Sequence, residues 1–125
     1  YGHRLASKGI NTKEAEFLRA NALLVDRALP WIGWQSELDE AIRRGNVSAP
    51  RDSLVLDVYP LVDDKGVSLI VVEVEHPDGE LVSYSPYMNQ NPSDEEMMDI
   101  EENPSKWLYM MQGATEWYGW KWTKL

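Results

Sequence analysis

The chain has 125 residues, of which 43% are hydrophobic and 26% are charged, so it is long enough for one domain with one contiguous core and too short for two ordinary domains. Its formal net charge is −9 and it has no cysteine, which excludes disulfides, thiol catalysis and cysteine-ligated zinc. No apolar stretch approaches the roughly 18–20 residues that cross a bilayer, so we expect no membrane association. We expect a single domain over residues 1–125 in the cytoplasm, although a chain that begins with Tyr1 leaves export with a removed signal open.

The first predicted element is a helix. Asn11 and Glu14 have the spacing of an N-cap and its partner, and apolar residues then recur near helical intervals. This pattern predicts a helix from about Thr12 to Leu29.

A second predicted helix follows a break. Pro30 lacks a backbone donor and disfavours helical geometry at the residue before it, so the segment Pro30–Trp34 is predicted to be a bend. Ser36 is the expected cap of the second helix, which ends at Gly45 after two arginines.

The middle of the chain changes to the pattern of β-strands. The segments Leu54–Val62, Val67–Glu75 and Leu81–Ser85 are rich in valine, leucine and isoleucine. The turn sequences Asp63–Gly66 and Pro77–Gly79 separate them, which predicts a three-stranded antiparallel meander.

Four-residue loops would assign the strand residues to two largely apolar faces. One face would hold Leu54, Leu56, Val58, Leu69, Val71, Val82 and Tyr84, and the other would hold Val55, Asp57, Tyr59, Ile70, Val72, Val74 and Leu81. Two apolar faces indicate that helices cover one face and the C-terminal segment covers part of the other, and they are also compatible with a homodimer.

Short helices and a last strand are predicted near the C-terminus. Pro86–Pro92 has the composition of a loop, and Ser93 with Glu96 has the spacing of a capping box for a helix from Asp94 to about Glu101. A further short helix is expected over Lys106–Gln112, followed by a strand over Thr115–Thr123 with Tyr118, Trp120 and Trp122 on one side. The predicted fold class is α+β, with two N-terminal helices packed on an antiparallel sheet of about four strands and short helices before the last strand.

The most informative feature is an acidic stretch with no compensating cation. Residues 1–51 contain eight basic and six acidic side chains, whereas residues 52–125 contain four basic and fifteen acidic ones. No Lys or Arg lies between Gly66 and Lys106, but ten carboxylates do: Glu73, Glu75, Asp78, Glu80, Asp94, Glu95, Glu96, Asp99, Glu101 and Glu102. Such a field can imitate nucleic-acid phosphates or steer a basic protein, and a solvated face that maintains solubility is the simpler alternative.

The candidate partner-binding residues combine charge with aromatic anchors. The long-range field is assigned to Asp94, Glu95, Glu96, Asp99, Glu101 and Glu102, and the anchors to Tyr87, Trp107 and Tyr109. The same field would repel phosphate, so no direct nucleic-acid binding is expected.

Tryptophans are unusually frequent at the C-terminus. Four of the six (Trp107, Trp117, Trp120 and Trp122) lie in the last nineteen residues. They can complete a core that has only one phenylalanine, or they can form a stacking platform for sugar rings. The platform predicts that Trp120 or Trp122 is exposed.

No metal or cofactor site is predicted. His76 has acidic neighbours, including Asp78 and Glu80, of types that hold metals or transfer protons, but its position before Pro77 is more simply that of a residue flanking a turn. The chain also lacks a phosphate-binding glycine loop, a nucleophile elbow and a zinc-protease helix motif.

The sequence therefore favours a non-enzymatic acidic binding protein that blocks a basic protein, such as a toxin, a nuclease or a DNA-binding enzyme. It would act as an immunity protein or a nucleic-acid mimic does. The alternatives are a carbohydrate-binding module or small hydrolase that uses exposed tryptophans and a carboxylate pair, and an assembly component whose acidic face is only solvated.

Overall fold

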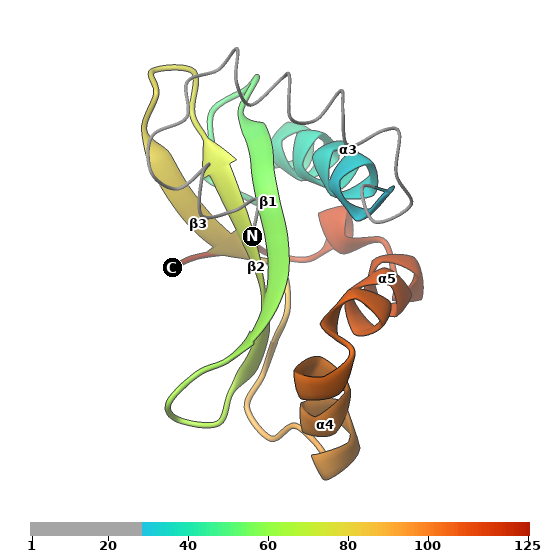
Figure 1. Cartoon of the computed structure of the whole chain (residues 1–125). Helices are drawn as coiled ribbons and strands as arrows, with labels where there is room; N and C mark the ends of the chain where they lie inside the picture. The colour runs from blue at the N-terminus through green and yellow to red at the C-terminus, as the bar shows by residue number, and fades with distance from the viewer. Residues whose placement is uncertain (1–28) are drawn as a thin grey trace.

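The computed structural model describes residues 29–125, with side chains described from residue 33 onward. These residues form three α-helices, one short 3-10 helix and a five-stranded antiparallel sheet, so the predicted α+β class is confirmed. Figure 1 shows the sheet on the left and the helices along its right-hand side. The helix predicted from Thr12 falls almost wholly on residues 1–28, outside the described residues.

Helix α3 (Leu29–Arg44) is continuous through the segment that was predicted to bend. The predicted break at Pro30–Trp34 and the cap at Ser36 are therefore wrong. Pro30 occupies the first turn of the helix, where an N–H group has no intrahelical acceptor to lose. Gly33 lies inside the helix, and a Cβ atom there would come within 2.1 Å of Gln112 Nε2. The glycine thus allows Gln112, on helix α5 (Pro104–Ala114), to lie close to α3.

The C-terminal end of α3 matches the prediction. Gly45 has a φ of 77°, which favours glycine, and its N–H donates to the Ile42 carbonyl at 3.1 Å. The next N–H, of Asn46, donates to the Ala41 carbonyl at 2.8 Å. These two bonds form a Schellman motif, which stops the helix at the predicted glycine.

The three long strands form the predicted meander. Strands β1 (Leu54–Val62), β2 (Ser68–Glu75) and β3 (Leu81–Ser85) pair antiparallel in chain order, and their bounds agree with the predicted ones to within one residue. Among the described strands β1 pairs only with β2, so it lies at one end of the described strand order.

The loops between the strands differ from the prediction by one residue each. Val62 pairs with Ser68 and Glu75 pairs with Leu81, so both loops have five residues instead of four. In the first loop the Asp63 carboxylate accepts hydrogen bonds from the backbone N–H groups of Lys65 and Val67, both at 2.9 Å. The bond to Val67, the residue before β2, keeps Val67 in the turn.

The longer loops make the predicted faces of the sheet wrong, because a slip of one residue moves a whole strand's side chains to the other face. Val58 pairs with Val72, which pairs with Tyr84, so these three side chains share the face toward the helices. A bulge between Val55 and Asp57 then changes the register of β1. The bulge places Val55 on the helix face as well.

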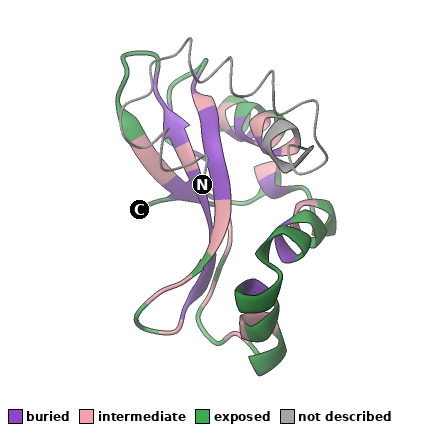
Figure 2. Ribbon diagram, viewed as in Figure 1, coloured by how far each residue is buried: buried purple, intermediate pink, exposed green. Residues whose placement is uncertain are grey.

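The main core lies between this face and the helices. Its buried members include Trp34, Leu38, Val55, Ile70, Val72, Tyr84, Ile100, Trp107, Leu108, Trp117 and Trp122. The Trp34 ring lies 6.0 Å from that of Trp117 and 6.2 Å from that of Trp122. Figure 2 shows these buried residues along the strands and on the inner sides of the helices.

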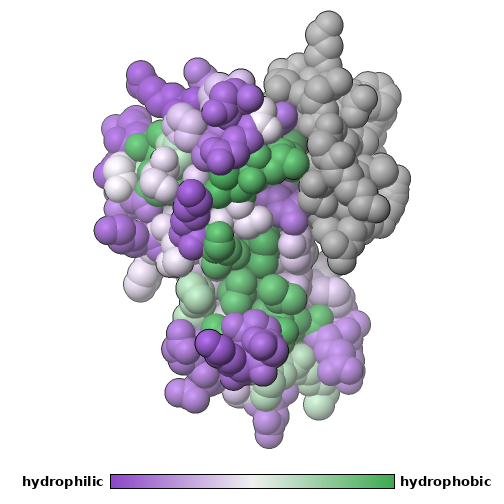
Figure 3. Space-filling model, turned by 90° about the vertical axis from the view of Figure 1, so that its left-hand side faces the viewer, coloured by the Kyte–Doolittle hydropathy of each residue, from purple (hydrophilic) through white to green (hydrophobic). Residues whose placement is uncertain are grey.

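The opposite face of the sheet carries a smaller apolar cluster of Val67, Leu69 and Val71 with the half-buried Tyr59. Figure 3 views the molecule from this side and shows apolar surface bordered by hydrophilic side chains. Asp57 and Glu73 lie opposite each other on this face, and the Tyr59 hydroxyl donates to Glu73 at 2.8 Å. The face is therefore mixed and not purely apolar.

The C-terminal strand is much shorter than predicted. Residues Trp117–Gly119 form the 3-10 helix η2, and strand β5 (Thr123–Lys124) pairs with β3. The predicted strand over Thr115–Thr123 is therefore wrong. In a strand Trp120 and Trp122 would share one face and Trp117 would lie on the other. Instead, Trp117 and Trp122 are both buried in the core and Trp120 is exposed. The Trp122 N–H donates to the Asn46 carbonyl at 2.8 Å, so this segment is fixed against the end of α3 instead.

Two short helices precede the last strand, as predicted. Strand β4 (Met88–Asn89), inside the segment expected to be a loop, pairs with β2, and helix α4 (Asp94–Glu102) follows. Ser93 caps α4 by accepting the Glu96 N–H at 3.0 Å. Only Asn103 separates α4 from helix α5 (Pro104–Ala114), whose first position is a proline.

Candidate functional site

The acidic stretch is divided among three places in the fold. Glu73 and Glu75 lie on β2, Asp78 and Glu80 lie in the turn between β2 and β3, and the other six acids lie on α4. Glu75 is buried and Glu73 is half-buried, so neither contributes an exposed charge. The exposed acids concentrate on α4.

Helix α4 presents five of its six acids to solvent. Asp94, Glu95, Asp99, Glu101 and Glu102 are all exposed. Within residues 33–125, none of the ten acids of the stretch forms an ion pair with a lysine or arginine. Figure 1 shows α4 at the end of the molecule farthest from α3. Among the described residues, the charge of α4 is therefore not offset by an ion pair with a lysine or arginine.

Two arginines of α3 are engaged within their own part of the fold. Arg43 and Arg44 both bond to Glu40 on α3, with Arg44 Nε at 2.8 Å from the carboxylate. The hydrogen bonds from Arg43, and then from Arg44, lower the pKa of Glu40 to about 2. Arg44 also lies over the Tyr118 ring, 4.5 Å from its centroid. These two cations thus serve α3 and η2, and not α4.

Local structure explains part of the charge on α4. Asp94, Glu95 and Glu96 occupy the first turn of the helix, where the helix dipole favours anions. Asp99, Glu101 and Glu102 lie outside that turn. The C-terminal half of the helix therefore carries charge that its own dipole does not explain.

Glu96 has an internal role, unlike the other five acids on α4. It is half-buried and accepts hydrogen bonds from the Tyr87 hydroxyl at 3.0 Å, from Asn89 Nδ2 at 3.3 Å and from the Ser68 hydroxyl. Burial, with a smaller contribution from this carboxylate, raises the pKa of Tyr87. Glu96 thereby fixes α4 to β2 and β4, so its charge is largely used within the fold.

The three predicted aromatic anchors are not equally accessible. Trp107 is only 7% exposed and belongs to the core, and the half-buried Tyr87 packs edge-on against it with ring centroids 6.0 Å apart. Tyr109 is 59% exposed on α5. Of the three, only Tyr109 is available to a partner without rearrangement.

Two exposed methionines accompany Tyr109 and were missed from the sequence. Met98 on α4 is 55% exposed, and Met110 on α5 is 62% exposed. Helical spacing offered a signal, because Ile100 and the pair Trp107 and Leu108 are the buried residues of these helices. We name the five exposed acids of α4 together with Met98, Tyr109 and Met110 the α4–α5 surface.

Most of the tryptophans complete the core. Trp34, Trp107, Trp117 and Trp122 are each at most 7% exposed, whereas Trp120 is 58% exposed. Trp117 and Trp122 satisfy their indole N–H groups on backbone carbonyls, at 2.7 and 3.0 Å. Among the described side chains a single tryptophan is thus left for a surface role, instead of a platform of several.

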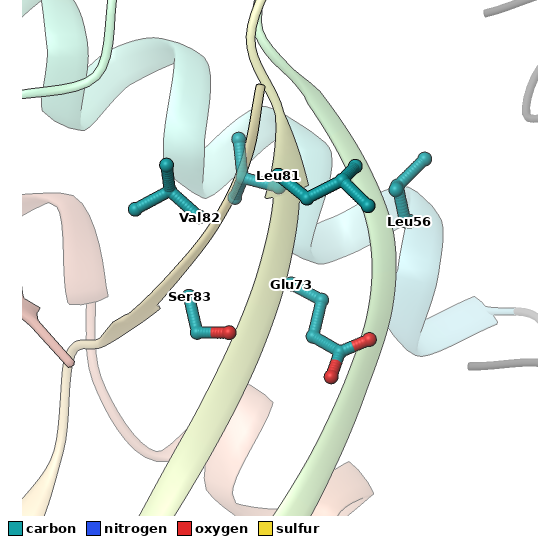
Figure 4. A pocket seen from close by; sticks show the side chains of 6 residues that line it. Leu56, Glu73, Leu81, Val82 and Ser83 are labelled. Carbon is teal, nitrogen blue, oxygen red and sulfur yellow. The ribbon is translucent and has the colours of Figure 1, made fainter. Parts of the chain in front are cut away.

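Carboxylates line two of the shallow depressions on the described surface. One, of about 210 Å³, is lined by Leu56, Glu73, Val74, Leu81, Val82 and Ser83. Figure 4 shows its one carboxylate, Glu73, on β2 beside the Ser83 hydroxyl and the apolar side chains. The other, of about 410 Å³, lies between α3 and Tyr118 and contains Glu37, whose pKa is raised chiefly by burial. Neither depression is lined by a histidine, and the second also contains Glu40, which Arg43 and Arg44 already engage.

A scan of protein-family models gives no match, and comparisons with curated proteins and with solved structures give none either. Among the described residues, no helix is both long and apolar enough to cross a lipid bilayer. The function is therefore inferred from the surface of the chain.

Proposed function

We propose that the chain is a non-enzymatic binding protein that uses the α4–α5 surface to block a basic surface on another protein. The observation that carries this proposal is the set of five exposed acids on α4 that have no lysine or arginine partner within residues 33–125. Uncompensated charge of one sign attracts an oppositely charged protein over a distance and orients it on arrival.

The apolar side chains of the α4–α5 surface can supply binding free energy, which long-range charge alone does not. Interfaces gain most of their binding free energy from a few buried anchors, often aromatic, while charged rims mainly accelerate association. Tyr109, Met98 and Met110 are exposed on the two helices that carry or adjoin the acids. We infer a partner whose basic surface includes an apolar depression.

The partner class follows from the sign of the charge. A nuclease toxin or a DNA-binding enzyme presents a basic surface that normally meets phosphates, and an acidic helix can occupy such a surface as an immunity protein or a nucleic-acid mimic does. Nucleic acid would repel the chain itself. We therefore propose that the chain inhibits the basic protein by direct contact, without a cofactor. We place this activity in the cytoplasm.

The second candidate function, carbohydrate binding, is favoured by one observation. Trp120 is 58% exposed, and its ring offers a stacking face to a sugar. Trp122, the other tryptophan considered for this role, is 4% exposed. A site with one exposed ring is weaker support than the charged surface on α4.

The proposal is tested by affinity capture at low and moderate salt with two charge-matched variants. The α4 variant carries Glu95→Gln, Asp99→Asn, Glu101→Gln and Glu102→Gln, and it keeps Ser93 and Glu96 so that the cap and the contact with the sheet survive. The control variant carries Asp39→Asn, Asp52→Asn, Asp64→Asn and Glu116→Gln, which are exposed acids outside α4. Both variants change the formal net charge from −9 to −5, because four carboxylates become amides.

The expected result is one basic protein, identified by mass, that the wild type and the control variant capture and the α4 variant loses. Equal recovery by both variants would show that the charge of α4 has no specific role. The acidic face would then be a solvated surface.

A further inference from the structure

The turn between β2 and β3 brings three potential metal ligands together. One ring nitrogen of His76 and one carboxylate oxygen each of Asp78 and Glu80 all lie within 4.8 Å of one another. The distance from His76 Nδ1 to Glu80 Oε1 is 3.2 Å. Alternate residues of a short segment thus converge, although the sequence suggested only a residue beside a turn.

Backbone hydrogen bonds fix this convergence. The His76 N–H donates to the Glu80 carbonyl and the Gly79 N–H donates to the His76 carbonyl, both at 2.8 Å. Gly79 has a φ of 93°, which a residue with a Cβ rarely adopts. The Glu80 N–H also donates to Asp78 Oδ1 at 2.9 Å. The turn is therefore closed by its own backbone before any ion binds.

The orientation of the imidazole is fixed from the side of the core. His76 is 9% exposed, and its Nε2 atom lies 2.9 Å from the hydroxyl of Tyr84, which is 1% exposed. When Nε2–H donates to that hydroxyl, Nδ1 is left with a lone pair on the side of the Glu80 carboxylate. Histidines that bind metals are commonly held by such a second hydrogen bond, which selects the tautomer and the ring orientation.

We propose that His76, Asp78 and Glu80 bind a divalent transition-metal ion of the Zn²⁺ type. Two ligands at about 2.0–2.1 Å in a tetrahedral zinc site lie about 3.3–3.5 Å apart, and the Nδ1 to Oε1 distance of 3.2 Å is close to that separation. One imidazole with two carboxylates is a donor set that suits Zn²⁺, Co²⁺ or Mn²⁺ better than Ca²⁺, which prefers oxygen ligands only.

The charges around the turn favour the same ion. Asp78 and Glu80 are exposed, and the sequence has no lysine or arginine between Gly66 and Lys106. A divalent cation would offset the charge of these two carboxylates, which no lysine or arginine of the same stretch of sequence can offset. Three protein ligands leave a fourth position for water or for a group from a partner.

The test is a titration of the whole chain with ZnCl₂ by calorimetry at physiological ionic strength and with Mg²⁺ in excess, which suppresses non-specific binding to acids. The ligand variant carries Asp78→Asn and Glu80→Gln, and asparagine at position 78 keeps an oxygen for the Glu80 N–H. The matched control carries Asp63→Asn and Asp64→Asn in the other hairpin loop, which removes the same charge. The ligand variant leaves the His76–Tyr84 contact untouched, so it is expected to fold.

We expect one Zn²⁺ ion to bind per chain, with an affinity that falls by about tenfold or more in the ligand variant and stays unchanged in the control. Co²⁺ should give visible absorption bands that only the ligand variant loses, and bound Zn²⁺ should shift the ring nitrogens of His76 in NMR spectra. Absence of saturable binding would overturn the proposal. Equal affinity in the ligand variant would also overturn it, because the ion would then bind the acidic surface in general.

Discussion

Replacement of Trp34 by alanine is expected to lower the free energy of unfolding by about 3–5 kcal/mol, the usual range for removal of a buried aromatic ring. Trp34 is fully buried, and its ring packs against Trp117 and Trp122, so it connects α3 with the C-terminal segment. A stability change of this size is a large fraction of the total for a domain of this length. Urea unfolding followed by circular dichroism measures it.

Trp120→Ala is the matched control for this prediction, because it removes the same ring from an exposed position. Its expected cost is below about 1 kcal/mol. Trp34→Phe should cost much less than Trp34→Ala, since the buried indole N–H of Trp34 has no hydrogen-bond partner among the described residues and its removal offsets part of the lost packing. Similar losses for Trp34→Ala and Trp120→Ala would contradict the described core.

The α4 variant is expected to associate with the captured partner about 10- to 100-fold more slowly than the wild type at low salt. The dissociation rate should change much less, because exposed charges act mainly during the encounter. Added salt should slow the wild type steeply and the α4 variant only slightly, since the screened field is largely absent from the variant. Stopped-flow mixing at several salt concentrations gives both rates.

Two further variants separate steering from contact. The control variant, with the same net charge, should retain most of the wild-type rate. Tyr109→Ala leaves the charge intact and should instead accelerate dissociation, because it removes an exposed ring that can be buried by the partner. An α4 variant whose salt dependence equals that of the wild type would refute electrostatic steering by this helix.

The strands were predictable from the sequence, but the faces of the sheet were not. Runs of branched apolar residues between turn sequences determine where β1, β2 and β3 lie. The face of the sheet on which a residue lies depends on the number of residues in the preceding loop. In the first loop, Val67 N donates to the side chain of Asp63, so Val67 belongs to the loop and not to β2. The bulge at Leu56 then shifts the register within β1. Neither feature has a strong local signal.

Pro30 illustrates a similar ambiguity at a helix end. Proline kinks or breaks a helix when it lies in the helix interior, but it is favoured in the first turn. The same residue therefore predicts either a bend or the start of a helix. In the C-terminal segment, alternating aromatic residues suggested a strand. The burial of both Trp117 and Trp122 follows from packing against Trp34, which is distant in the sequence.

The acidic stretch was visible in the sequence, but the separate roles of its members were not. A pattern of charges does not reveal that Glu96 accepts three hydroxyl or amide partners, or that Glu75 is buried on a strand. Likewise, the convergence of His76 with Glu80 depends on how the five-residue turn closes. Of the predicted partner-binding residues, five acids and Tyr109 belong to the α4–α5 surface. Met98 and Met110 also belong to this surface but were not predicted.

Site-specific photo-crosslinking shows whether α4 contacts the partner. A photoreactive residue in place of Glu101, which is exposed on α4, is compared with the same residue in place of Asp64, which is exposed in the loop between β1 and β2. If α4 forms the interface, cells producing the protein are expected to yield a crosslink to one basic protein from position 101 and none from position 64. Crosslinks to the same protein from both positions, or none from position 101, would contradict the claim that α4 forms the interface.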